Sequence, residues 1–497
     1  YDDHLESPYR MQDPEAFPAT THWLPRVDRR APEALDRGIA ELERLAADGG
    51  PFFLWIHLYD PHFPYDAPPE WRRGQPDPYL AELEAVDAEL GRLERAIAAL
   101  GLTDAVLLVT ADHGEGLDDH GEDEHGILLY DEVLKVPLIA RAPGLLPAGA
   151  LIDEPARTVD VASTLLEMAG VGERLGAGGS LLAAWRGEAG VPGPWAYAET
   201  IKPRMAYSGS PVKVYRTADR KLIWAPRPEL YDLVADPGER SNLAAEHPQE
   251  VEELAEELED IVLQTLRWPP GWAESAHLDP EREEALRSLG YLTGDGAGVP
   301  EVTAPEEMKT PGFDPKDLVD VVMAGRDVEN GFHTRARRKL ERFLRTVAPP
   351  KEDPSLAPLW SLARQNLGAI TLHAGEFRTA AGHLTEALRL EPTNVDAAWE
   401  LVMVLNLDGR PGEALAAADR SLQVQPRAEK LRFHRAMALL LKGDPEAARE
   451  ELRALATQAR NPDVNQFAVF FAERIGTDEE AQAVAFYRDS WKLEGTR

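Results

Sequence analysis

Side chains that bind metal ions or move protons are concentrated between Thr110 and Pro137. Asp112 and His113 are adjacent there and follow residues 105–109, an aliphatic run with the length of a strand. Chemistry in open α/β sheets collects beyond the carboxyl ends of strands. A carboxylate beside an imidazole suits Ca²⁺, Mn²⁺, Mg²⁺ or Zn²⁺, but such an ion needs further ligands. Taken alone, the pair fits a helix N-cap beside a surface histidine better than a metal site.

His62 is the second candidate, in the loop Asp60-Pro-His62-Phe-Pro. The loop follows residues 51–59, a nearly continuous apolar run that predicts a strand buried on both faces. A histidine held between two prolines at a strand end could serve as a general acid or as an oxyanion donor. The alternative is a loop histidine that only packs against aromatic side chains.

Two more histidines and a glutamate lie on the loop after His113. His125 precedes Gly126 and is the better candidate for the site, whereas His120 is expected to face solvent. Glu115 either orients His113 as an outer partner or caps the next turn.

Bulk composition narrows the function classes. The chain has 497 residues, a formal net charge of −34 and no cysteine. The acidity argues against general nucleic-acid binding, which requires a basic face, and the absence of cysteine excludes disulfides and zinc–thiolate sites. No apolar run approaches the length of a membrane span, and the N-terminus has no signal-peptide pattern.

The elements expected to position these residues alternate between helix and strand. This alternation predicts a layered α/β domain with a parallel sheet over residues 1–293. The expected helices cover 31–47, 78–100 and 159–169, and the expected strands cover 51–59, 105–109 and 136–140.

A change of pattern near residue 195 predicts a small antiparallel subdomain, about 195–293. Its expected strands are 212–215 and 221–224, followed by an acidic helix over 248–266. Residues 294–317 are rich in glycine, proline and acidic residues and are expected to form a linker.

The last part of the chain, 318–497, contains an internal repeat. Glycine recurs every 34 residues, and so do a buried-type alanine and an apolar residue; Pro392 and Pro426 close the first two units. The recurring positions are Gly375, Gly409, Gly443, Ala380, Ala414, Ala448, Leu384, Ala418 and Leu452. The region resembles tetratricopeptide repeats, with core repeats at about 361–462, a helical cap at 318–347 and a closing pair at 464–492.

Four motifs in the first domain resemble those of sulfatases, in the alkaline-phosphatase-like superfamily. They are the strand and histidine loop at 51–65, Thr110-Ala-Asp-His-Gly-Glu115, the segment 125–139, and the Leu-Tyr-Asp-Leu segment at 229–243. Sulfatases with appended tetratricopeptide repeats are similar to the whole arrangement.

The resemblance implies roles for individual residues. Asp112 and His113 would be metal ligands, His62 would act near the leaving group, and His125 would contact the transferred sulfuryl or phosphoryl oxygens. It further implies a divalent ion, with Ca²⁺ the first choice, and a small-molecule or glycan sulfate or phosphate ester as substrate. A protein or peptide partner on the repeats and an extracytoplasmic location also follow from it.

The family's nucleophile motif, Cys/Ser-x-Pro-x-Arg after an acidic metal-ligand pair, has no convincing counterpart. Asp2-Asp3 follows no strand, and Ser7-Pro-Tyr-Arg10 has its proline one place too early. The sequence is therefore expected to hold the carboxyl-terminal two thirds of a catalytic domain and to be inactive alone.

Two alternatives stay open at this point. One is a non-catalytic, sulfatase-like scaffold that works through its repeats. The other is a phosphodiesterase or phosphoethanolamine-type transferase on the same fold.

Overall fold

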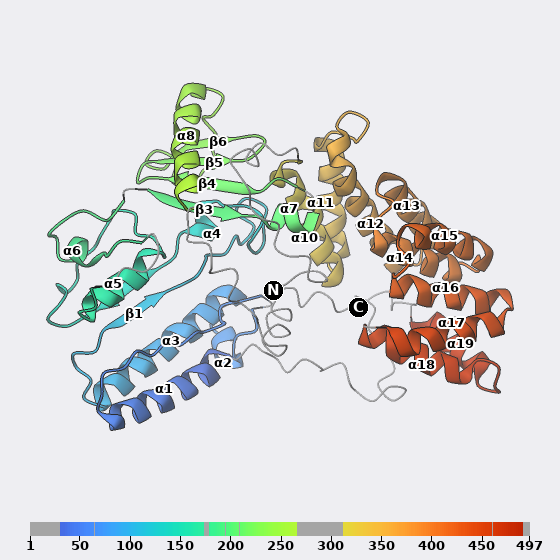
Figure 1. The fold of residues 1–497 in the computed structure, drawn as a ribbon, viewed down its shortest axis with the longest axis horizontal. Helices are drawn as coiled ribbons and strands as arrows, with labels where there is room; N and C mark the ends of the chain where they lie inside the picture. The colour runs from blue at the N-terminus through green and yellow to red at the C-terminus, as the bar shows by residue number, and fades with distance from the viewer. Residues whose placement is uncertain are drawn as a thin grey trace.

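The structure, a computed structural model, describes residues 30–265 and 312–490, apart from 64, 173–177, 194, 208 and 460. The two N-terminal motifs discussed above and most of the predicted linker lie outside this range. Figure 1 shows an α/β region on the left and a helical region on the right.

The first described elements are helices. α1 (Ala31–Asp48) and α3 (Pro78–Ala99) confirm the expected helices, and the short α2 (Pro69–Arg72) lies between them. α3 begins where Asp77 accepts hydrogen bonds from the backbone N–H groups of Tyr79 and Leu80, the usual role of an N-cap aspartate. Leucine and isoleucine side chains of α1 and α3 pack together in one apolar cluster.

The prediction of a strand buried on both faces at residues 51–59 is wrong. This segment forms no strand, and only one face packs, through Leu54, Ile56 and Leu58, against apolar side chains of α1 and α3. The other face is open, with Phe53 74% and Trp55 80% exposed. An apolar run that finds a neighbouring layer on one side only remains half exposed.

The predicted parallel sheet is also wrong for the described residues. β1 (Leu107–Thr110) and β2 (Leu138–Arg141) pair antiparallel, with Thr110 opposite Leu138. The chain between β1 and β2 includes α4 (Asp131–Leu134). It comes back to the carboxyl end of β1, where Gly114 and Glu115 bond to Val133 and Glu132, and does not cross over a helical layer. A parallel pair would need such a crossover.

The small antiparallel sheet expected after residue 195 is confirmed, and it has four strands. Its order is β3 (Ala196–Thr200), β4 (Val212–Arg216), β5 (Arg220–Trp224) and β6 (Glu229–Asp232). α8 (Pro248–Thr265) packs on it. The remaining helices here are α5 (Asp160–Met168), α6 (Leu182–Trp185) and α7 (Lys202–Tyr207).

The C-terminal region is helical, as expected. It comprises α10 (Pro315–Glu329), α11 (His333–Thr346), η3 (Pro354–Leu356), α12 (Ala357–His373), α13 (Phe377–Leu390), α14 (Val395–Leu407), α15 (Pro411–Val424), α16 (Glu429–Lys442), α17 (Pro445–Gln458), α18 (Pro462–Arg474) and α19 (Glu480–Ser490). The recurring glycines all lie at turns between helices with positive φ, and the recurring alanines are all fully buried.

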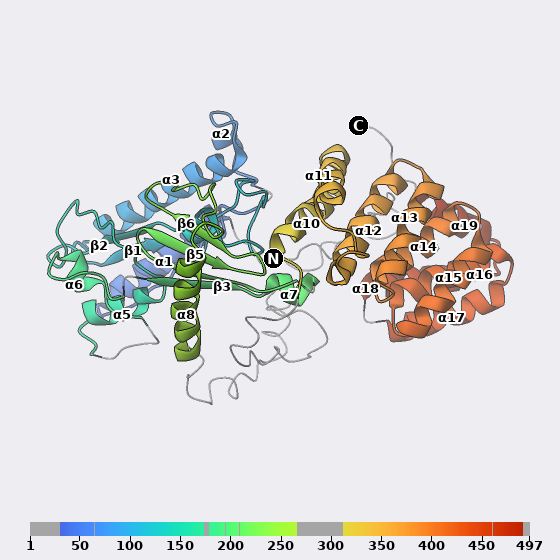
Figure 2. The same ribbon diagram turned by 90° about the horizontal axis from the view of Figure 1, so that it is seen from above.

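The two regions share one apolar core. Residues 127–130 and buried side chains of β4–β6 pack with the apolar residues of α10, α11 and α12. Figures 1 and 2 both place α10 and α11 between the sheets and the later helices. Phe313, near the end of the predicted linker, is 3% exposed and belongs to this core, and the neighbouring Asp314 is also buried. Within the described ranges, no helix is both long and apolar enough to cross a bilayer.

Candidate active site

Glycines fix the turn that follows β1. A Cβ atom on Gly114 would lie 2.1 Å from the carbonyl oxygen of Glu132, and one on Gly116 would lie 2.3 Å from that of Glu122. The backbone N–H of Gly114 donates to Val133, and that of Gly116 donates to Glu124. Only glycine permits so close a backbone approach, which explains the spacing Asp-His-Gly-Glu-Gly.

This turn brings three histidines from two distant segments together. The rings of His113 and His125 lie 3.9 Å apart between centroids, and those of His125 and His62 lie 6.1 Å apart. His62 also stacks on Tyr59 at 4.4 Å. The structure thus brings His62, His113 and His125 into one cluster, although their roles there stay predictions.

Each of the three imidazoles is oriented by a hydrogen bond from Nδ1. His62 donates to the carbonyl of Phe63 at 2.7 Å, His113 to that of Gly114 at 2.8 Å, and His125 to the Glu115 carboxylate at 3.1 Å. When these rings are neutral, Nε2 therefore carries the lone pair in all three. Such fixed tautomers are suited to metal ligation or to proton transfer at Nε2.

Glu115 has a third role that neither sequence interpretation included. Its carboxylate holds His125 on one oxygen and accepts from the Tyr65 hydroxyl at 2.9 Å on the other. Burial, together with this negative charge, raises the pKa of Tyr65. Glu115 thereby joins the His62 loop to the loop that carries His125.

Burial lowers the pKa of His62, and the nearby His125 acts in the same direction. Its hydrogen bond to Phe63 and the negative charges of Glu115 and Glu124 oppose this effect. Burial therefore disfavours the imidazolium form of His62 when no anion is bound.

Asp112 and His113 offer two ligand atoms to a common space. Asp112 Oδ2 and His113 Nε2 lie 3.8 Å apart, and the Asp112 side chain is 72% exposed. That separation suits two ligands of one divalent ion with bonds of about 2.0–2.6 Å. The pair fits half of a metal site, and no further carboxylate or imidazole of the described residues completes a three-ligand group with it.

A different group, Asp119, His120 and Glu132, has ligand-type atoms within 4.8 Å of one another. Its members are already engaged: His120 pairs with Glu132 at 2.5 Å and with the Glu239 carbonyl at 3.2 Å, and Asp119 pairs with Arg240. This pattern is that of a structural ion-pair network.

The expectation that His120 faces solvent is wrong. Its side chain is 11% exposed, because the ring stacks on Tyr130 at 3.7 Å and both nitrogens are hydrogen-bonded.

Sequence reasoning missed the charged residues behind the site. Lys221 is fully buried and contacts Asp131 at 3.0 Å and Glu239 at 2.6 Å, while Arg216 also binds Asp131. Glu239 additionally accepts from the Asp131 backbone N–H. The Leu-Tyr-Asp-Leu segment signalled that this part of the chain matters, but its spacing did not show that Glu239 anchors α4.

Comparisons with known proteins show what the chain is similar to. Residues 14–171 match the sulfatase family model, and residues 123–267 match that of the N-sulphoglucosamine sulphohydrolase C-terminal region. The sulfatase resemblance is confirmed. All four predicted site residues lie inside the first match.

Curated relatives are named sulfatases. The chain is 32% identical over 197 residues to an N-acetylglucosamine-6-O-sulfatase of Bacteroides thetaiotaomicron, covering 37% of this chain and 34% of the relative. It is 26% identical over 289 residues to an ulvan-active sulfatase of Formosa agariphila, covering 51% and 54%. The chain thus spans about a third to a half of the length of the curated relatives it matches.

Solved sulfatase structures align with about half of the chain. One is a 2-O GAG sulfatase, with 20% identity, a TM-score of 0.35 and coverage of 55% of this chain and 70% of that one. Another is a complex with its substrate D-glucosamine-2-N,6-O-disulfate, with 30% identity, a TM-score of 0.35 and coverage of 40% and 46%.

Proposed function

We propose that this chain contributes the acid–base and metal-ligand groups of a metal-dependent sulfatase. The observation that carries the proposal is the clustering of His62 and His125 beside the Asp112–His113 pair. A divalent ion held by Asp112 and His113 would offset the negative charge that develops on the sulfuryl oxygens. The proposal concerns a protein in which these residues are accompanied by a nucleophile.

His62 is proposed as the general acid for the leaving oxygen. Its Nδ1 is held by the Phe63 carbonyl, so Nε2 is the nitrogen that would carry and deliver the proton. Burial disfavours the charged ring in the free protein. A bound sulfate ester adds negative charge beside it, and that charge favours the imidazolium needed for proton delivery.

His125 is proposed to donate from Nε2 to a non-bridging oxygen of the transferred group. Glu115 supports this role, because a carboxylate on Nδ1 stabilises the positively charged ring and fixes its orientation. Tyr65, bound to the same carboxylate, holds Glu115 in place.

A sulfated sugar is the proposed substrate class. Relatives named for N-acetylglucosamine-6-O-sulfate, hexuronate-2-O-sulfate and ulvan support this choice. A phosphodiester remains the alternative, since the same groups could serve phosphoryl transfer.

The test compares leaving groups. In the full-length natural protein, His62→Gln should slow an alkyl or sugar sulfate about 10²–10⁴-fold. An activated aryl sulfate, which needs little protonation, should be slowed far less. His57→Gln is the matched control, because His57 is exposed and lies on the same segment. Equal losses on both substrates would remove the general-acid role.

Parallel assays with 4-nitrophenyl sulfate and a bis-4-nitrophenyl phosphodiester separate the two reaction classes. Asp112→Asn should abolish turnover and lower the content of bound divalent ion measured by atomic emission. A full-length natural protein that hydrolyses neither substrate would favour the non-catalytic scaffold.

We also infer that the helical region consists of tetratricopeptide-type repeats. The 34-residue period supports this assignment, since Gly375, Gly409 and Gly443 share a positive φ at equivalent turns. Circular dichroism of a chain with one complete 34-residue unit deleted tests it: a retained helical fold with proportionally lower ellipticity is expected, and collapse of the whole region would argue against repeats.

A further inference from the structure

The loop that carries His125 has a well-defined internal structure. We call residues 116–126 the site loop. The backbone N–H groups of Gly116, Leu117 and Asp118 donate to the carbonyls of Glu124, Asp123 and Glu122, respectively. Leu117 and Asp118 have positive φ values of 48° and 66°, a costly conformation for residues with side chains. Contacts from outside the loop are therefore needed to hold this conformation.

Such contacts come from both regions. Within the α/β region, Asp119 pairs with Arg240 and His120 pairs with Glu132, and the helical region holds the two acidic residues directly before His125. Glu124 forms an ion pair with Arg326 of α10 at 2.5 Å, and both side chains are largely buried, at 9% and 13% exposed. Asp123 pairs with Lys339 of α11 at 3.1 Å and lies 3.7 Å from Arg335. The two acidic residues directly before His125 are thus both matched by cations 200 or more positions away in sequence.

Arg335 and Lys339 of α11 are also held by a carboxylate within the hairpin. Asp327, which is fully buried, accepts from Arg335 at 2.6 Å and lies 3.4 Å from Lys339. Lys339 therefore bridges a carboxylate of its own hairpin and a carboxylate of the loop. A partly buried pair in this geometry loses little side-chain freedom when the loop docks, which makes the contact more favourable than an exposed pair.

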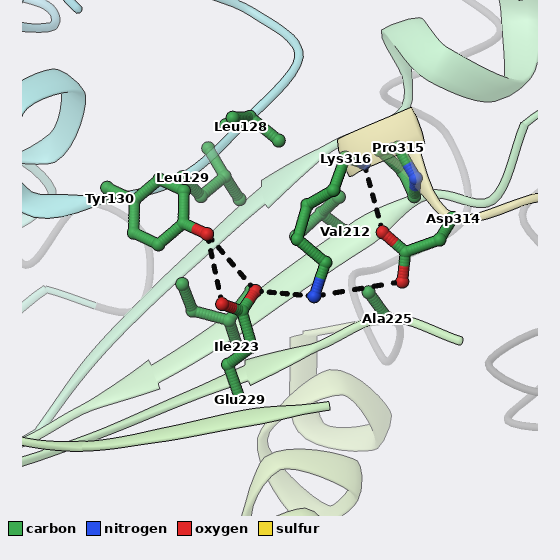
Figure 3. A pocket seen from close by; sticks show the side chains of 10 residues that line it. All are labelled: Leu128, Leu129, Tyr130, Val212, Ile223, Ala225, Glu229, Asp314, Pro315 and Lys316. Atoms are coloured by element: carbon green, nitrogen blue, oxygen red, sulfur yellow. Dashed lines mark hydrogen bonds and ion pairs between the residues drawn. The ribbon is translucent and has the colours of Figure 1, made fainter. Parts of the chain in front are cut away.

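The start of α10 is anchored as well, at the junction drawn in Figure 3. Lys316 contacts Glu229 of β6 at 2.9 Å, and Glu229 accepts from the Tyr130 hydroxyl at 3.0 Å. Asp314 caps the helix by accepting from the Lys316 backbone N–H. The cavity at this junction has a volume of only about 10 Å³, so α10 sits tightly on the sheet that also supports the segment after His125.

We propose that the α10–α11 hairpin is a positioning element of the active site. Arg326 and Lys339 hold the site loop, through Glu124 and Asp123, in the conformation in which His125 faces His62. Arg326 and Lys339 are positioning residues that act through these carboxylates. The proposal rests on the proposed function only in naming this cluster the active site.

The arrangement gives the helical region a direct influence on the site. The negative charge of Glu124 reaches His62 and Tyr65, and its position depends on Arg326. A displacement of α10 would therefore move both the backbone before His125 and a charge beside the proposed general acid. Through its first hairpin, the helical region is in this sense part of the site's support and more than an attached binding module.

The test is hydrogen exchange of the full chain, measured without substrate or metal. Arg326→Met keeps the apolar stem and removes the charge, whereas Arg326→Lys keeps a charge. Arg326→Met should speed exchange of the amides of residues 116–118 about tenfold, and Arg326→Lys should largely restore protection. Arg337→Met is the matched control: Arg337 is exposed on α11 of the same hairpin, and its charge acts on His383 of α13.

Three outcomes would overturn the proposal. They are unchanged exchange in the site loop of Arg326→Met, equal effects of the Met and Lys variants, and a rise that spreads evenly over α10–α19. If Arg326→Met does not fold, Asp123→Asn tests the second contact between the hairpin and the loop, the ion pair with Lys339, at a side chain that is 27% exposed. It should raise exchange in the same amides to a smaller extent, and no rise would equally overturn the proposal.

This experiment is independent of turnover. A protein that lacks sulfatase activity but shows the loop-specific exchange pattern would contradict the proposed function and support the hairpin's role. In an active protein, Arg326→Met should lower kcat more than it raises KM, and Arg326→Lys should recover kcat. A change confined to KM would argue against positioning.

Discussion

Two apolar runs of similar composition differ in how far they are buried in this molecule. Residues 51–59 are open to solvent on one face, with Phe53 and Trp55 strongly exposed. In α14 every residue from Ala397 to Asn406 is buried, because neighbouring helices cover it on several sides. An apolar run therefore indicates that burial would be favourable, and the packing of neighbouring elements determines whether the run is buried.

Buried charges show the reverse contrast. In the sulfatase-like region, Lys221 is fully buried but contacts two carboxylates. In the helical region, Glu400 is 7% exposed, and one carboxylate oxygen has no hydrogen-bond partner among the described residues. Lys221 is thus matched by two carboxylates, whereas Glu400 is buried with one oxygen left without a hydrogen bond.

The largest effect that tests this contrast is expected at Lys221. Lys221→Met would leave Asp131 and Glu239 close together with their shared cation removed, and breaking such a buried group typically costs about 3–5 kcal/mol. Urea unfolding should show this loss. Lys135→Met, at an exposed position on the connection that carries Asp131, should change stability by no more than about 0.5 kcal/mol.

A small effect at Lys221 would mean that Arg216, which also binds Asp131, compensates for the missing cation. The double variant Lys221→Met with Glu239→Gln distinguishes these cases. It should recover part of the loss, because the carboxylate left without its lysine is then neutral.

Sequence reasoning succeeded where structure repeats locally and failed where it depends on distant neighbours. The period of Gly375, Gly409 and Gly443 predicted the helix turns, because each repeat packs against the next one along the chain. The residue types of His62 and His125 marked them as candidates. The contact between Glu124 and Arg326 spans 202 positions, and a single sequence carries no pattern for it.

The same limit explains why a parallel sheet was wrongly predicted. An aliphatic run identifies β1, but the direction of its partner depends on the path of the connection between them. That path depends on Gly114 and Gly116, whose close backbone contacts only the folded chain reveals. The exposure of one face of residues 51–59 could not be predicted either, since periodicity does not show whether a second layer covers that face.

A pH-dependent effect is expected at Glu400. Burial raises the pKa of Glu400 to about 8, and Asp396 adds to the rise. Between pH 4.5 and 8 the folded state keeps a proton that the unfolded state releases, so this group lowers stability as pH rises. Glu400→Gln should be more stable than the wild type by about 1–3 kcal/mol at pH 8 and nearly equal to it at pH 4.5.

The measurement is urea unfolding of both proteins across this pH range. The contributions of the other titrating groups cancel when the two free energies of unfolding are subtracted. Glu413→Gln is the control, because Glu413 is exposed and pairs with Arg410 on the surface of α15. A difference that is constant with pH would show that Glu400 does not titrate in this window, and the two regions would then be alike in matching their buried charges.

The smallest effect is expected at Trp55, and it tests the contrast between the two apolar runs. Trp55 is 80% exposed, so Trp55→Ser should change the free energy of unfolding by no more than about 0.5 kcal/mol. Trp399→Ser in α14 is the matched variant: Trp399 is 4% exposed and should cost about 3–5 kcal/mol. Thermal or urea unfolding of both variants measures the difference. A large loss at Trp55 would mean that its open face is covered in solution, and the two runs would then differ in their partners and not in their burial.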